Sequence, residues 1–210
     1  MDFFGLLIVF GVIIVSMVLH ELAHGAVAYW LGDDTARDSG RLSLNPLKHL
    51  DPVLSILLPM MLAISGGPVF GGAKPIPVDG RRLKWDEWGM ALVAVAGPAT
   101  NILIAFIFFL IGHFSGLIYS MDYVGYIFQG FVFINLGFCI FNMLPIPPLD
   151  GSRVLYALAP EVVQRVMLGM ERYGIIIVFG LIVMFGSVFS NIIGNAMDGV
   201  LWAFEWIVGV

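Results

Sequence analysis

The sequence has a single cysteine, Cys139, so no disulfide can form within the chain. Charge is also scarce, because only 12% of the residues are Asp, Glu, Lys or Arg against 60% that are hydrophobic, and the mean hydropathy is +0.96. The formal net charge is −5 and no basic cluster is present, which argues against a nucleic-acid partner. Such a composition is far from that of a soluble domain and is typical of a chain that lies in a lipid bilayer.

Long stretches without any charged residue cover much of the chain. They are residues 3–19, 52–73, 88–112, 124–149 and 173–197. A helix needs about 20 apolar residues to cross roughly 30 Å of hydrocarbon, so four or more spans fit. The first stretch continues through polar residues into another apolar segment, which a cleavable signal peptide would not do, so we expect a mature helix there. The sequence therefore predicts an all-α polytopic membrane protein with five to six hydrophobic helices.

The basic residues are confined to three short segments. They are Arg37, Arg41 and Lys48, then Lys74, Arg81, Arg82 and Lys84, then Arg153, Arg165 and Arg172. By the positive-inside rule all three segments face the cytoplasm. The spans then cover about 4–31, 88–111, 124–145 and 173–192, whereas 195–210 is either a sixth short span or an interfacial helix. We expect a multi-pass protein of a prokaryotic plasma membrane.

Two segments are expected to depart from simple spanning helices. A full crossing by 52–66 would put the second basic segment on the wrong side, so we predict a re-entrant excursion that leads into the Gly- and Pro-rich residues 66–78. A surface connector is the alternative. Alternation in RLSLN predicts a short membrane-associated β-hairpin within 35–50. One domain over 1–210 is expected, with a catalytic core over about 4–155 and C-terminal helices over about 173–210.

The strongest motif is HELAH, from His20 to His24. Histidines at i and i+4 lie on one face of a helix, where two imidazoles can bind one zinc ion with Glu21 beside them as a base. With this composition, about 0.002 chance matches are expected. His20 lies ~16 Å below the nearer membrane surface, because about 11 residues at 1.5 Å each separate it from the helix end. A carboxylate at such depth is rarely kept without a partner, and a metal would be that partner.

A hydrolytic zinc site usually has three protein ligands and an open position for water. His49 in the polar first loop and His113 in the loop without basic residues both fit poorly. Asp150 closes the uncharged stretch 124–149 in NMLPIPPLDG, and its helix approaches the same half of the membrane as HELAH. Three prolines break that helix and would turn the Asp150 carboxylate inward as the third ligand. Taken alone, PPLDG is more often only a turn.

HELAH and NMLPIPPLDG together resemble the two signatures of the site-2 protease family of intramembrane metalloproteases. AGPATN at 96–101 resembles the AGPxxN helix of that family, and GGPVFGGAKPIPV resembles the glycine-rich loop of some members. The likeness covers about 20–151. Because the sequence shows neither a PDZ nor a CBS domain, it resembles a minimal form of the family.

The resemblance implies a three-helix core and one zinc ion per chain, bound by residues matching His20, His24 and Asp150, with Glu21 as the general base. It implies an endopeptidase whose substrates are transmembrane segments of other proteins, in regulated intramembrane proteolysis. The site would lie nearer the cytoplasmic side, and the oligomeric state is not predicted.

An unwound substrate needs backbone partners. We expect the glycine-rich loop, including Gly71 and Gly72, to offer it a strand-like edge, and Asn101 or Asn142 to hydrogen-bond a carbonyl or the oxyanion. Ordinary polarity between packed helices is the alternative reading of both asparagines.

Two other functions are alternatives to proteolysis. A catalytically idle scaffold that binds membrane helices would have no need of a base such as Glu21. A metal transporter should carry further ionisable residues along facing helices, and the stretches 88–112 and 124–149 have none.

Overall fold

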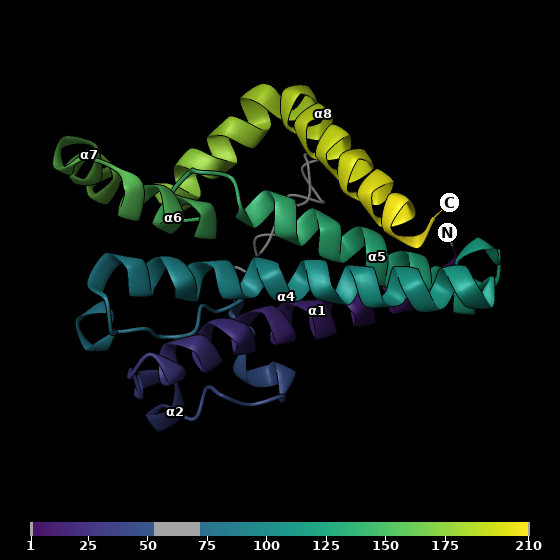
Figure 1. Ribbon diagram of the computed structural model, residues 1–210, viewed down its shortest axis with the longest axis horizontal. Helices are drawn as coiled ribbons and strands as arrows, with labels where there is room; N and C mark the ends of the chain where they lie inside the picture. Colours follow the sequence, from purple (N-terminus) through teal and green to yellow (C-terminus); the bar gives the residue numbers. More distant parts are fainter. Residues whose placement is uncertain (1, 53–71, 210) are drawn as a thin grey trace.

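The computed structural model describes residues 2–52 and 72–209, and within them all regular structure is helical. Four helices are long and apolar enough to cross a membrane, namely α1, α4, α5 and α8 (Figure 1). In chain order the elements are α1 Phe3–Trp30, α2 Thr35–Asp38, η1 Pro46–Lys48, η3 Gly80–Arg82, α4 Asp86–Ser115, η4 Leu117–Tyr119, α5 Tyr123–Asn142, α6 Asp150–Leu158, α7 Glu161–Glu171 and α8 Gly174–Val208. The predicted helical membrane class is confirmed, whereas a count of five to six spans is not.

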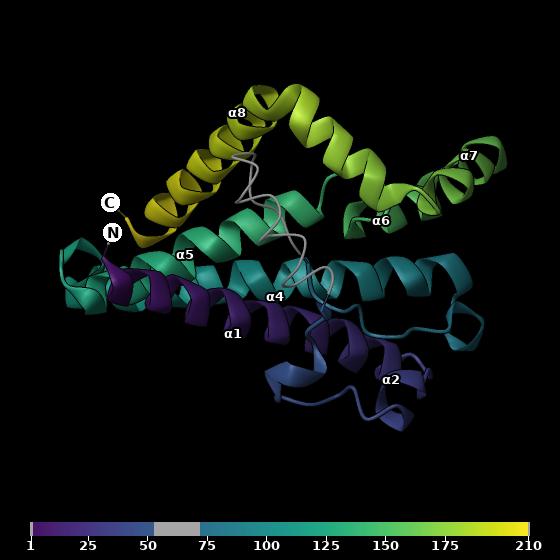
Figure 2. The ribbon, with the colours of Figure 1, turned by 180° about the vertical axis from the view of Figure 1, so that it is seen from behind.

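Helices α1, α4 and α5 form a three-helix core in which each helix contacts the other two (Figures 1 and 2). Residues spaced four apart on α4 make one buried stripe. They are Gly89, Val93, Gly97, Asn101, Ala105 and Phe109. Half of these residues are Gly or Ala, which lets helix backbones approach closely where no hydrophobic effect drives them together in lipid.

The N-termini of α1 and α5 lie together at one end of the core. Asp2 and Asp122 cap these helices by accepting from the backbone N–H groups of Gly5 and Gly125, both at 2.8 Å. The Tyr123 hydroxyl also donates to Asp2 Oδ2 at 2.7 Å, which joins the two helix starts. Helices α1 and α5 therefore run in the same direction, as the predicted order of spans requires.

Helix α8 is bent at Phe185, whose φ of −127° and ψ of 29° are not helical (Figures 1 and 2). Gly186 and Ser187 follow directly, and a Gly/Ser pair is a common cause of a sharp kink. Beyond the bend, Phe204 packs on Ala105 and Phe109 in α4 and on residues of α5. The bend falls within the predicted span 173–192, and the helix continues without a break through 195–208, so the two predicted segments belong to one bent helix.

The β-hairpin predicted within 35–50 is wrong, because these residues form α2, η1 and the irregular segment between them. Alternation in RLSLN does not bury one face, since Leu42 is half-buried and Leu44 is 72% exposed. The Ser43 N–H bonds to the Arg41 carbonyl two residues back instead of to a partner strand. Local turns therefore satisfy this backbone.

The predicted re-entrant segment 52–66 lies almost wholly outside the described residues, as does the first part of the glycine-rich loop. Residues 72–79 are described and have no helix or strand. Within them, the Ile76 side chain packs against Gly25 of α1, so this segment lies along the HELAH helix.

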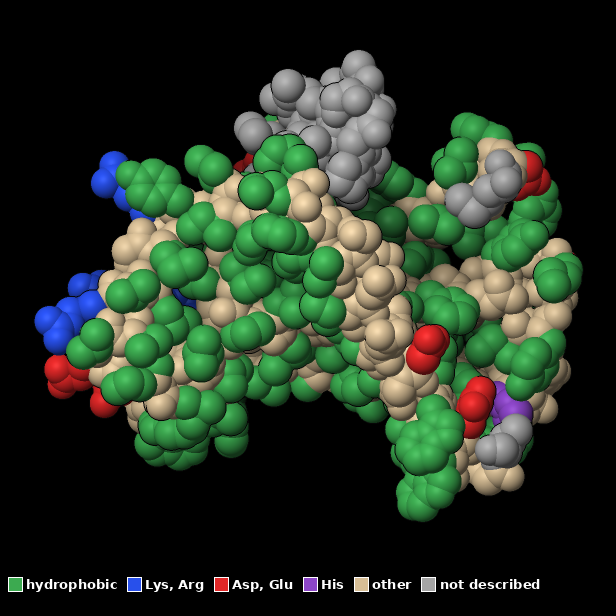
Figure 3. All heavy atoms as spheres, turned by 90° about the horizontal axis from the view of Figure 1, so that it is seen from above, with side chains coloured by type: hydrophobic (Ala, Val, Ile, Leu, Met, Phe, Trp, Pro, Cys, Tyr) green, Lys and Arg blue, Asp and Glu red, His purple; other side chains and the backbone are tan. Residues whose placement is uncertain are grey.

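The basic segments gather at the end of the core opposite to the N-termini of α1 and α5. In the view of Figure 3 the Lys and Arg side chains lie at one end only, the end that holds α2, α6 and α7 in Figure 1. This distribution agrees with the predicted topology, in which all three basic segments share one side of the membrane.

Labelling of single cysteines should place the two ends of the core on opposite sides of the membrane. In a Cys139→Ala background, Ser39→Cys and Arg165→Cys lie at the exposed basic end, and Met121→Cys lies in the loop between α4 and α5. A membrane-impermeant maleimide applied to sealed vesicles of one orientation should modify either the first two or the third. Modification of all three from the same side would contradict the arrangement.

Candidate metal centre

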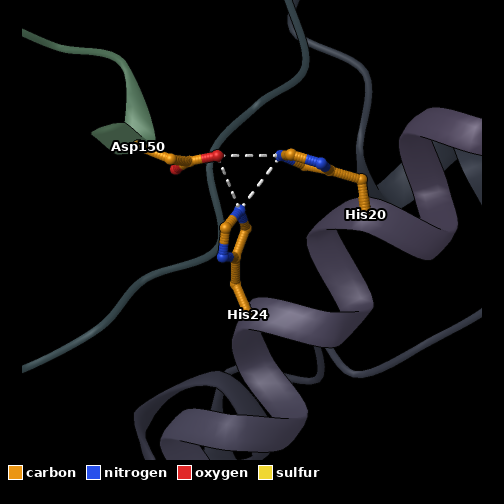
Figure 4. Close-up of side chains that lie close together, drawn as sticks. All are labelled: His20, His24 and Asp150. Atoms are coloured by element: carbon orange, nitrogen blue, oxygen red, sulfur yellow. Dashed lines mark hydrogen bonds and ion pairs between the residues drawn. The ribbon is translucent and has the colours of Figure 1, made fainter. Parts of the chain in front are cut away.

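Three side chains from two distant segments converge on one point (Figure 4). His20 and His24 project from α1, and Asp150 is the first residue of α6. The two Nε2 atoms are 3.0 Å apart, and Asp150 Oδ2 lies 3.3 Å from that of His20 and 3.4 Å from that of His24. The structure thus brings together the three metal ligands that the sequence predicts.

The α1 helix supplies the histidine pair through its regular geometry. Residues four apart lie one above the other on the same face, and this face of α1 is buried against the core. His20 is 7% exposed and His24 is 8% exposed. Each imidazole is therefore surrounded mainly by protein atoms and has little contact with solvent.

The NMLPIPPLDG segment carries Asp150 back to the histidines. Pro145, Pro147 and Pro148 have no N–H to donate, so α5 ends at Asn142 and the chain turns until α6 begins at Asp150. The Pro147–Pro148 peptide bond is cis.

Two glycines let this turn pack closely. A Cβ on Gly151 would lie 2.2 Å from the Met143 carbonyl oxygen, and one on Gly174 would lie 2.7 Å from Cδ of Pro148. The end of α5, the start of α6 and the start of α8 therefore meet at the turn, which fixes the direction of Asp150.

Helix α4 orients both imidazoles through their other ring nitrogen. His24 Nδ1 is 2.7 Å from the carbonyl oxygen of Val93, which can only accept, so Nδ1 carries the proton and Nε2 keeps its lone pair. His20 Nδ1 is 2.6 Å from Oδ1 of Asn101. Pro98 lies within the same stretch of α4 and has no N–H to donate to the carbonyl of Ala94.

The three converging atoms suit a cation. In the neutral imidazoles with the proton on Nδ1, both Nε2 atoms present lone pairs, and Asp150 Oδ2 is a buried acceptor, so the three atoms can bind one cation together. Four ligands bound tetrahedrally to zinc at ~2.0–2.1 Å are about 3.3–3.4 Å from one another. The observed separations of 3.0, 3.3 and 3.4 Å are close to this spacing. Two imidazoles and one carboxylate are also a common ligand set of hydrolytic zinc.

Glu21 lies beside the cluster and is held by the segment before η3. Its Oε2 accepts from the backbone N–H of Ile76 at 2.8 Å. The other oxygen, Oε1, makes no hydrogen bond within residues 2–52 and 72–209. One oxygen of the carboxylate is thus held by the backbone.

Asn101 does not occupy the position expected of a substrate-binding residue. It is fully buried, and its amide contacts His20 through Oδ1 and Asn135 through Nδ2, at 2.6 and 2.7 Å. The expectation that it binds a substrate carbonyl or the oxyanion is therefore not supported, and it lies behind a metal ligand instead.

The other tentative residues are placed only in part. Asn142, at the end of α5, is half-buried and donates one N–H to the carbonyl of Phe138, at 3.0 Å. Gly71 lies outside the described residues. A Cβ on Gly72 would meet no atom within 4 Å among the residues that the structure describes. Of the rejected histidines, His49 is buried against the Ser43 carbonyl and His113 bonds Tyr119 beyond the far end of the core.

The described part of the glycine-rich loop has few free backbone groups. The N–H groups of Lys74 and Ile76 donate to the His49 carbonyl and to Glu21, and Pro75 and Pro77 have none. The carbonyl oxygens of Lys74 and Pro75 accept from Nη2 of Arg41, at 2.7 and 3.3 Å. A strand-like edge for a substrate would therefore have to come from outside 74–76.

Several groups that hold the side chains of the metal centre were not identified from the sequence. The Val93 carbonyl and the Ile76 N–H are backbone groups, which no motif reveals. Asn135 stands alone in an apolar stretch without a recognisable pattern. Gly97 lies within AGPATN and could have been found, because a glycine in a buried helix signals the close approach of another group.

Gly97 provides the space for the histidine pair. A Cβ at this position would lie 2.5 Å from both His20 Cε1 and His24 Nε2. Gly97→Ala should therefore displace the imidazoles and weaken zinc binding at least tenfold, measured by competition with a chelator in detergent. Gly137→Ala is the matched control, since no atom of residues 2–52 and 72–209 would lie within 4 Å of its Cβ. Equal zinc affinity in both variants would show that the close approach is unimportant.

Comparison with known proteins agrees with the geometry. The model of peptidase family M50 matches residues 118–186. "Putative zinc metalloprotease YwhC" of Bacillus subtilis is 43% identical over 173 residues, which are 79% of this chain and 75% of that protein. Two proteins named Rip2 are also similar. That of Mycolicibacterium smegmatis is 33% identical over 81% of this chain and 64% of its own length, and that of Mycobacterium tuberculosis H37Rv is 30% identical over 91% and 71%.

No solved structure gives a significant match. The extent of the likeness to YwhC is enough to show the family, and the names of these relatives confirm zinc as its metal. The resemblance predicted from HELAH and NMLPIPPLDG is thereby confirmed, and the chain belongs to peptidase family M50, the site-2 protease family of zinc metalloproteases.

Proposed function

We propose that this chain is an HExxH-type zinc endopeptidase that hydrolyses peptide bonds within or near transmembrane segments of other membrane proteins. One observation carries the proposal: two imidazole nitrogens from a helix apolar enough to span a bilayer and one carboxylate oxygen from the start of α6 converge to within 3.4 Å of one another. A base, Glu21, stands beside them.

His20, His24 and Asp150 would hold the ion. When bound, zinc would polarise the scissile carbonyl and lower the pKa of a water molecule towards ~7, so that it can attack at neutral pH. Glu21 takes the proton from the attacking water and delivers it to the leaving amide nitrogen. Because Oε2 is held by the Ile76 N–H, Oε1 is the oxygen that carries this proton.

The substrate has to be locally unwound, because a transmembrane helix keeps its carbonyls in its own hydrogen bonds. Asn142 retains a second amide N–H for a substrate carbonyl or the oxyanion, after donating one to Phe138. Gly71 and Gly72 remain our candidates for backbone contacts with an extended substrate. Regulated intramembrane proteolysis is the process that such a reaction serves.

The polar groups around the cluster favour hydrolysis over ion transport. Among the described residues of α4 and α5, the side chains that hydrogen-bond to side chains of α1 are those of Asn101 and Asn135, and both are uncharged. A transport path would need ionisable groups staggered along these helices. The clustering of basic residues near the C-terminal end of α1 supports a site nearer the cytoplasmic side of a plasma membrane.

Glu21→Gln should separate metal binding from catalysis. The amide keeps the shape of the side chain and loses the base, so cleavage of a co-reconstituted transmembrane substrate should fall by at least 10²-fold. Zinc content, measured by elemental analysis, should stay near one per chain. Zinc-dependent cleavage at the wild-type rate would reject Glu21 as the base.

Removal of a ligand should have the opposite signature. His20→Ala and Asp150→Ala each leave two of three protein ligands, so both metal content and cleavage should be lost. His113→Ala is the matched control, because His113 lies in the last turn of α4 at the far end and should leave both unchanged. Full zinc stoichiometry in Asp150→Ala would remove that carboxylate from the site.

A further inference from the structure

A line of buried polar side chains leads away from His20 through all three core helices. We name Asn101 of α4, Asn135 of α5 and Ser16 of α1 the asparagine relay. Asn101 Nδ2 donates to Asn135 Oδ1 at 2.7 Å, and Asn135 Nδ2 donates to Ser16 Oγ at 2.8 Å. All three residues are fully buried, so water does not replace a missing partner.

One backbone carbonyl fixes the direction of every bond up to the histidine. The Asn135 amide atom that lies 2.8 Å from the Phe131 carbonyl oxygen has to be the nitrogen, because a carbonyl only accepts. The oxygen of Asn135 therefore faces Asn101, which has to present its own nitrogen. The oxygen of Asn101 is then the atom 2.6 Å from His20 Nδ1, so this ring nitrogen has to carry the proton.

The direction matters because an amide has a donor nitrogen at one end and an acceptor oxygen at the other. When the amide is flipped, the two exchange places, whereas both oxygens of a carboxylate accept. With its amide reversed, Asn101 would present N–H groups to His20 Nδ1, and the imidazole proton would move to Nε2. A protonated Nε2 cannot bind a metal. His24 does not face this ambiguity, since its Nδ1 bonds directly to a carbonyl.

We propose that Asn135 is a positioning residue of the metal centre: it fixes the orientation of the Asn101 amide and thereby keeps the Nε2 lone pair of His20 directed at the ion. This inference rests on the proposed metal site. Polar pairing between packed helices would explain that these side chains contact one another. It would not require a single direction that ends on a metal ligand.

Ser16 and Asn135 have different parts in the relay. Ser16 only accepts the second N–H of Asn135, while the Phe131 carbonyl alone already fixes the Asn135 nitrogen. Ser16→Ala should therefore leave the direction unchanged and is the matched control for Asn135→Leu, which is close to isosteric.

The protonated nitrogen of His20 can be observed directly. In metal-free, ¹⁵N-histidine-labelled protein at alkaline pH, the nitrogen shifts of His20, identified by their loss in His20→Ala, should show the proton on Nδ1 alone. Asn135→Leu should show a mixture of both tautomers, and Ser16→Ala should match the wild type. A proton on Nε2 in the wild type would overturn the proposal without any variant having to fold.

Zinc affinity of the full chain in detergent gives a second readout. Asn135→Leu should bind zinc 10- to 100-fold more weakly in chelator competition, as loss of an outer partner of a metal ligand typically does. Ser16→Ala should stay within threefold of wild type. Adding Asn101→Asp to Asn135→Leu should restore the affinity, because a carboxylate accepts from His20 Nδ1 in either orientation.

Two results of the zinc competition would contradict the inference. One is an affinity within threefold of wild type in Asn135→Leu, and the other is a loss that Asn101→Asp does not restore, as expected of a merely structural residue. Neither readout uses proteolysis. A wild-type protein that cleaved no substrate would refute the proposed function and leave the relay intact, whereas an unchanged tautomer in Asn135→Leu would refute the relay alone.

Discussion

Two imidazole nitrogens and one carboxylate oxygen lie within 3.4 Å of one another in the interior of the protein, and the surrounding helices hold them in this position. With both imidazoles neutral and protonated at Nδ1, the Nε2 atoms of His20 and His24 and the Oδ2 atom of Asp150 are three acceptors, so their closeness is unfavourable until a cation joins them. The packing of α1 against α4 and the proline turn before α6 hold the three atoms together despite this repulsion. The metal centre and the three-helix core are therefore one energetic unit.

Helix α4 contributes most to that unit without supplying a ligand. Gly97 makes room for both imidazoles, the Val93 carbonyl orients His24, and Asn101 orients His20. All three residues lie on the buried stripe with a spacing of four residues, so a single face of α4 positions both imidazoles. Substitutions on α4 are thus expected to change zinc affinity by displacing or reorienting the imidazoles, rather than by removing a metal ligand or the base.

The sequence predicted the long spans and the ligand set because both depend on short-range rules. Hydrophobic length identifies α1, α4 and α5, and the spacing of His20 and His24 needs only helix geometry. Asp150 was found by its place after three prolines. The same rules failed where tertiary contacts decide: the alternating residues 41–44 did not form a hairpin, and Phe185 became a bend between two arms of α8. Asn135 and the Ile76 N–H could not be predicted, since their importance comes only from the neighbours that the fold gives them. The single domain over 1–210 stays a prediction.

The most direct test of the metal centre is X-ray absorption at the zinc edge on the purified full chain. The extended fine structure should show two imidazole rings by their multiple scattering, together with oxygen neighbours at about 2.0–2.2 Å and no sulfur. Fewer than two imidazoles, or a sulfur neighbour from Cys139, would contradict the convergence of His20, His24 and Asp150 on one ion.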